Sequence, residues 1–201
     1  EAAAAAANGA AAAAVPTHLP VAREAAARSF LSVVLHLATH GLGLQVLGSP
    51  TNAPRLDRLL EAVMQCLGQD FSPTIKKHTI SIFGQLLNEI NTVGVTSSEL
   101  CTNLARFICD VVFPKCLKCV IVDIDLDDAS SLGVILKLSE FMLILKTTYA
   151  ENYSAFLIEQ LGAATPCPAG PAQSFAQAVA AAGHVNAVAG AVKDLATFAR
   201  Q

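Results

Sequence analysis

Hydrophobic residues recur at helical spacing along most of the chain. In residues 55–67, 73–91 and 96–114 they occur every three or four positions, which places them on one face of a helix. Residues 127–149 are apolar nearly all round, which is typical of a helix buried between neighbours. A further apolar segment, residues 152–161, follows directly. We therefore predict a series of helices of roughly 12 to 20 residues each.

Several residues mark where these helices begin and end. Ser72 followed by Pro73 predicts a helix start, with Ser as the N-cap and Pro in the first turn. Thr96 and Glu99 have the spacing of a capping box. Pro114 predicts the end of the helix that this box begins, because proline lacks the backbone N–H that the helix interior requires.

The two ends of the chain are rich in alanine. Residues 1–20 are of low complexity, and we expect them to be a disordered linker that precedes a folded segment, residues 21–201. After a Pro- and Gly-containing loop at 162–171, two alanine-rich helices are predicted, divided near Gly183. Because the chain begins with Glu1, we expect it to be part of a longer protein.

The overall pattern predicts an all-α protein. Residues 118–126 alternate like a strand, but a single strand in a helical chain has no pairing partner. The predicted helix pairs recur about every 40 residues, which is typical of a right-handed α-solenoid of antiparallel pairs, as in HEAT and armadillo repeats.

Composition and charge narrow the classes of function. Hydrophobic residues make up 53% of the 201 positions and charged residues 14%, which indicates a packed protein. The longest apolar stretch, residues 30–48, contains His36, His40, Gln45 and three glycines, so no membrane insertion is expected. The net charge of −3 argues against a generally basic nucleic-acid-binding domain but allows a local basic strip.

Cys116 and Cys119 have the C-x-x-C spacing of a zinc or redox site. Cys101 and Cys109 lie on one predicted helix about 12 Å apart, so they cannot both join such a zinc ion. One of them and a distant histidine, such as His78, would have to complete the site. A redox C-x-x-C normally accompanies a βαβ pattern, which this sequence lacks. Packing of small buried thiols is the favoured interpretation, and six unpatterned cysteines suggest a reducing compartment.

Two other motifs fail at required positions. Asp123, Asp125 and Asp127 match a calcium loop, but its glycine position is Asp128 and its glutamate position is Val134. A solvated acidic loop that caps the next helix explains them better.

The glycines at 41 and 43 lack the third glycine and the strand of a dinucleotide site, and they predict a helix end. The histidines are scattered, with no Ser/His/Asp grouping in a strand–turn–helix setting: His18, His36, His40, His78 and His184. We therefore expect no enzyme activity, no metal and no cofactor.

Six lysines are candidates for contact with phosphate groups. If the helices 73–91, 97–113 and 128–149 stack, some of these lysines line one surface. There they would contact phosphate as point charges that do not read the base sequence. The alternative is that they form a solubilising rim. The candidates are Lys76, Lys77, Lys115, Lys118, Lys137 and Lys146.

An ordered series of segments resembles the C-terminal part of the tRNA exportin family, which belongs to the importin-β-like HEAT-repeat receptors. The resemblance is carried by residues 23–47, 53–67, 76–87, 107–119 and 125–149 and by the closing segment 171–201. Residues 138–140, Leu-Ser-Glu, stand at the centre of one of these helices. Leu117 replaces the aromatic residue of the family's Pro-x-Cys-aromatic step, and Cys119 has no identified counterpart.

The resemblance implies a nuclear export receptor rather than an enzyme. Such a receptor binds tRNA cooperatively with the GTP-bound GTPase Ran, passes nucleoporins and shuttles between nucleus and cytoplasm. In the family the main Ran contacts lie in N-terminal repeats absent here, while the C-terminal arch helps to enclose tRNA. At Cys116 the resemblance implies no metal. The alternative is another helical-repeat receptor or scaffold that carries protein cargo.

Overall fold

The computed structural model describes residues 18–93 and 99–200, and in these ranges all regular secondary structure is helical. The helices are α1 (His18–Thr39), α2 (Gly43–Leu47), α3 (Leu56–Gln65), α4 (Pro73–Val93), α5 (Glu99–Phe107), α6 (Phe113–Lys118), α7 (Ser131–Tyr149), α8 (Tyr153–Ala164), α9 (Ala169–Ala181) and α10 (Val185–Phe198). The predicted all-α class is confirmed. Of the predicted linker, residues 1–17 lie outside the described part.

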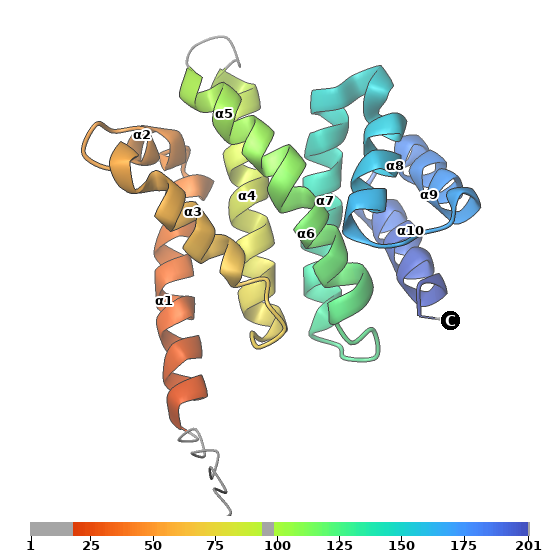
Figure 1. Cartoon of the computed structure of the whole chain (residues 1–201), viewed down its shortest axis with the longest axis horizontal. Helices are drawn as coiled ribbons and strands as arrows, with labels where there is room; N and C mark the ends of the chain where they lie inside the picture. The colour runs from red at the N-terminus through yellow and green to blue at the C-terminus, as the bar shows by residue number, and fades with distance from the viewer. Residues whose placement is uncertain (1–17, 94–98, 201) are drawn as a thin grey trace, which may run out of the picture.

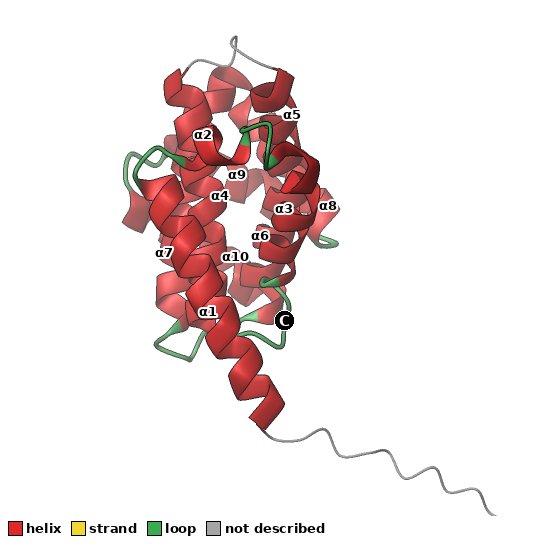
Figure 2. Ribbon diagram, turned by 90° about the vertical axis from the view of Figure 1, so that its left-hand side faces the viewer, coloured by secondary structure: helices red, strands yellow, loops and turns green. Residues whose placement is uncertain are grey.

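The helices form two layers (Figures 1 and 2). In one layer α4 packs between α1 and α7, and α10 packs against the other side of α7. The second layer contains α3, α5, α6 and α8, and α9 joins α8 to α10. The predicted right-handed, HEAT-like repeat stays a prediction.

Polar contacts give the directions of the first-layer helices. Ser72, just before α4, donates a hydrogen bond of 2.6 Å to Glu24 in the early part of α1. Asn91, near the end of α4, donates one of 2.9 Å to Thr148, near the end of α7. The helices α1, α4 and α7 are therefore parallel, and each chain return passes through the second layer. These three helices begin at residues 18, 73 and 131, so the predicted recurrence of about 40 residues is wrong. The repeat is longer because the return segments in the second layer are long.

Helix α10 reverses this direction. The Lys146 ammonium, near the end of α7, donates to the carbonyl of Ala182, which precedes α10. At the other end of α10, Arg200 donates to the carbonyls of Ile121 and Ile124, which lie before the start of α7. Helices α1, α4 and α7 are thus parallel, whereas α10, the fourth helix of this layer, runs in the opposite direction.

The second-layer segment 99–123 departs from the sequence prediction. Pro114 does not end a helix: it lies in the first turn of α6, and the chain stays helical from Glu99 to Asp123. A π-helical turn, Ile108–Val112, precedes α6, and a second one, Cys119–Asp123, follows it. Proline cannot donate a backbone hydrogen bond to the helix. The wider π-helical turn before Pro114 accommodates this missing bond. The strand alternative for residues 118–126 is also wrong.

Other predicted boundaries are confirmed. Helix α4 begins at Pro73, although the Ser72 hydroxyl bonds Glu24 instead of capping it. Helix α1 ends just before Gly41, whose positive φ of 67° suits glycine. The alanine-rich tail forms two helices on either side of Gly183. Thr96 of the predicted capping box lies outside the described residues.

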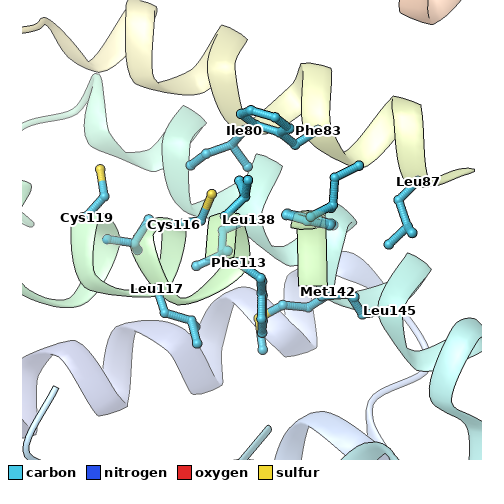
Figure 3. Packing of buried hydrophobic residues seen from close by; sticks show 14 of the residues in the cluster. Ile80, Phe83, Leu87, Phe113, Cys116, Leu117, Cys119, Leu138, Met142 and Leu145 are labelled. Carbon is cyan, nitrogen blue, oxygen red and sulfur yellow. The ribbon is translucent and has the colours of Figure 1, made fainter. Parts of the chain in front are cut away.

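The hydrophobic core lies between the two layers (Figure 3). Phe113 of α6 is fully buried and contacts two rings from other helices. Its ring centroid is 5.4 Å from that of Phe141 on α7, edge to face, and 5.7 Å from that of Phe156 on α8, stacked. Burial of such a side chain contributes about 1.5–3 kcal/mol, so this cluster joins α6, α7 and α8. Within the described ranges, no helix is long and apolar enough to cross a bilayer.

Candidate nucleic-acid interface

The adjacent lysines Lys76 and Lys77 of α4 have different environments. Neighbouring residues of a helix project about 100° apart, so the two side chains point in different directions. Lys76 is only 4% exposed, and its ammonium lies close enough to Cys119 to oppose part of the rise in that thiol's pKa. Lys77 is half-buried on the outward side of α4. Burial therefore removes Lys76 from the set of lysines that an RNA phosphate can reach.

Lys77 and Lys137 share the outward face of α4 and α7. A Cβ atom added at Gly133 on α7 would lie 3.2 Å from the Lys77 Cδ atom, so the stem of Lys77 passes over α7 at this glycine. Lys137 follows Gly133 by one turn of α7. On the other side of Lys77, Arg28 of α1 is close enough to His78 to affect it: burial, then Lys77 and Arg28, lower the pKa of His78.

We call Arg28, Lys77 and Lys137 the basic strip; it crosses α1, α4 and α7. Two of its three cations have acidic neighbours: Arg28 is 3.1 Å from Glu24, and Lys137 is 2.7 Å from Glu140. Among the described residues, no carboxylate lies within ion-pair distance of Lys77. Lys77 is therefore the cation of the strip with the most charge available to a phosphate.

Neutral polar side chains extend the same face toward the C-terminal ends of α4 and α7. Asn88, Asn91 and Thr92 of α4, with Thr147 and the apolar Leu143 and Ile144 of α7, line a shallow groove of about 380 Å³. The hydroxyls of Thr92 and Thr147 already donate to carbonyls of their own helices, so the side-chain amides of Asn88 and Asn91 are the donors that this groove offers to phosphate and sugar oxygens. These residues were not predicted from the sequence, although the helical period places those of α4 on its polar side, opposite the apolar stripe.

The remaining candidate lysines lie elsewhere. Lys115 and Lys118 are exposed on α6, in the second layer. Lys146 donates a hydrogen bond of 2.9 Å to the carbonyl of Ala182, so its ammonium already holds the start of α10 to α7. The structure therefore brings together only Lys77 and Lys137 of the six, and it adds Arg28.

The C-x-x-C pair lies inside the core (Figure 3). Cys116 is 0% and Cys119 1% exposed, among side chains of α4, α6 and α7. Burial raises the pKa of Cys116 well above the ordinary thiol value and that of Cys119 to about 11. Both sites thus favour the neutral thiol, whereas metal ligation and thiol chemistry require the thiolate. In the part of the chain that the structure describes, no three His, Cys, Asp or Glu side chains are grouped as metal ligands.

The acidic segment before α7 acts as a turn. The Asp125 carboxylate accepts a hydrogen bond from the backbone N–H of Asp127, at 2.9 Å. Asp128 accepts from the backbone N–H and the hydroxyl of Ser130, at 2.8 and 2.6 Å, and these bonds lower its pKa. The segment therefore forms the loop before α7, as predicted, but the N-cap residue Ser130 makes no side-chain capping hydrogen bond, so the predicted cap by an acidic side chain is not formed.

Comparison of the chain with protein-family models, with curated proteins and with solved structures finds no match.

Proposed function

We propose that this chain is a segment of a right-handed, HEAT-like α-solenoid in a receptor that binds tRNA. The observation that carries the proposal is the outward face of α4 and α7. On that face lies Lys77, which has no carboxylate within ion-pair distance among the described residues. The rest of the basic strip and a groove whose lining includes the amides of Asn88 and Asn91 lie on the same face. The resemblance to tRNA exportins supports this assignment of the ligand.

The proposed contact is to the RNA backbone and does not depend on base sequence. Lysine meets phosphate as a point charge, and amides and hydroxyls donate to phosphate and ribose oxygens. Duplex RNA is recognised mainly by shape and by such backbone contacts. In the proposed export cycle, GTP-bound Ran and tRNA favour the same wrapped state of the whole receptor, which couples their binding. Nucleoporin contact and shuttling between nucleus and cytoplasm belong to the same proposal.

A charge-reversal pair tests the proposed face. Binding of fluorescently labelled tRNA to the whole proposed receptor, of which this chain is a segment, is measured by anisotropy at several salt concentrations, with and without GTP-bound Ran. Lys77→Glu is expected to weaken binding about tenfold and to reduce the salt slope by roughly 1, because a phosphate contact is lost. Lys118→Glu is the matched control, since Lys118 is an exposed lysine in the other layer.

The second candidate function is a scaffold for protein partners. It is favoured by the net charge of −3 and by apolar grooves, including one lined by Phe30, Val33 and Leu37 of α1. Equal effects of the two lysine variants, or no tRNA binding with or without Ran, would support the scaffold and contradict the RNA-binding face.

A further inference from the structure

A groove in the second layer lies between α3 and α5 and has a volume of about 530 Å³. Figure 1 shows the place, where α3 and α5 run beside each other in front of α4. Buried Leu60 and Leu104 form its floor, and half-buried Met64 and Phe107 stand beside them. These apolar groups form a continuous hydrophobic surface that both helices share.

The charged side chains that line this groove have one sign. Asp57 and Glu61 are exposed one turn apart on α3, so both carboxylates lie along the same edge. Arg58 and Arg106, on the same two helices, do not line the groove. An RNA backbone would be repelled by this edge and would gain little from the apolar floor, so the chemistry favours a protein occupant with cationic side chains.

We infer that this groove binds an amphipathic helix of a partner protein, with leucine-type side chains on the floor and lysine or arginine beside Asp57 and Glu61. A helix in a groove presents its apolar anchors at positions i, i+3 or i+4 and i+7. The lining residues of α3 run from Leu56 to Met64, which corresponds to about 12 Å along the axis. That length accommodates about two turns of a docked helix.

One end of the groove is closed. A Cβ atom added at Gly48, just after α2, would lie 2.6 Å from the Leu100 Cδ2 atom, so the chain after α2 lies against the start of α5. A docked helix therefore extends away from this contact, toward Met64 and Phe107. The inference concerns the second layer and does not depend on the proposed RNA contact on α4 and α7.

The chain provides its own reporter for the test, because it has only two methionines. Met64 lines the groove, whereas Met142 is fully buried in the core at 0% exposure. The chain is labelled with ¹³C at the methionine methyl groups and titrated with a synthetic amphipathic peptide that carries leucines on one face and lysines beside them. A second peptide carries glutamate in place of every lysine.

We expect the lysine peptide to shift the Met64 methyl signal saturably and to leave Met142 unchanged. The glutamate peptide should bind at least about tenfold more weakly, because its carboxylates meet two like charges. The double variant Asp57→Lys/Glu61→Lys should reverse the order of the two peptides. Glu159→Lys, an exposed position on α8, is the matched control and should leave the order unchanged.

Three results of the peptide titrations would overturn the inference. They are equal binding of the two peptides, an order that the double variant leaves unchanged, and equal shifts of Met64 and Met142. Sedimentation of the chain alone addresses a competing occupant. Self-association that the double variant abolishes would mean that a second copy covers the groove.

Discussion

The buried thiol of Cys119 makes the stability of this protein depend on pH in a way that distinguishes packing from thiolate chemistry. Burial raises the pKa of this thiol from an ordinary value of 9.0 to about 11. Below pH 9.0 the thiol is protonated in both the folded and the unfolded chain, so its contribution to stability is complete. Above that pH the unfolded chain loses the proton and the folded chain keeps it, so the folded state loses stability until the pH passes about 11.

The magnitude follows from the size of the shift. One pKa unit corresponds to about 1.36 kcal/mol, so a shift of about two units corresponds to about 2–3 kcal/mol at full ionisation of the unfolded thiol. About 2 kcal/mol of this should be lost by about pH 10.5. Cys116 is more completely buried and adds a loss in the same direction.

The assay is urea unfolding of the wild-type chain and of Cys119→Ala between about pH 7 and pH 10.5. Other groups also titrate in this range, so the measured quantity is the difference in unfolding free energy between the two proteins. Wild type should be the more stable at neutral pH, because alanine leaves a small cavity, and this advantage should shrink by about 2 kcal/mol at the alkaline end. A difference that stays constant or grows with pH would refute the reasoning. A growing difference would mean that Cys119 is a thiolate in the folded protein, as a metal or redox site requires, and a constant one would mean that its pKa is the same in the folded and unfolded chains.

Two further variants test contacts between distant parts of the chain. Arg200→Ala removes hydrogen bonds to the carbonyls of Ile121 and Ile124, so it should lower the unfolding free energy by about 1–2 kcal/mol. Arg200→Lys keeps the positive charge and should lower the unfolding free energy less. An unchanged urea midpoint for Arg200→Ala would show that these bonds do not stabilise the fold. Tyr153→Phe removes a buried hydrogen bond of 2.6 Å to the Met142 carbonyl and should cost about 1 kcal/mol in urea unfolding at an unchanged m-value. A Phe variant as stable as the wild type would contradict that estimate.

The helical class was readable from the sequence because helix formation depends on local periodicity. The stripe that includes Ile75, Ile82 and Leu86 recurs every three or four residues, and these residues are buried in α4. Local turn chemistry likewise identified the start of α4 at Pro73 and the helix end before Gly41. Pro114 was misread because its effect depends on the π-helical turn before it, and single-residue preferences do not encode such a turn.

Which side chains share a surface was decided only by the tertiary structure. The sequence presents Lys76 and Lys77 as an equivalent pair, but packing of the second layer against α4 buries the first and leaves the second beside Gly133. The separation of Arg28 and Lys77 along the chain gives no sign that both lie near His78, because α1 and α4 become neighbours only through packing. Helical period therefore specifies the faces of each helix, whereas the partner of each face follows from the long-range burial that brings separate helices together.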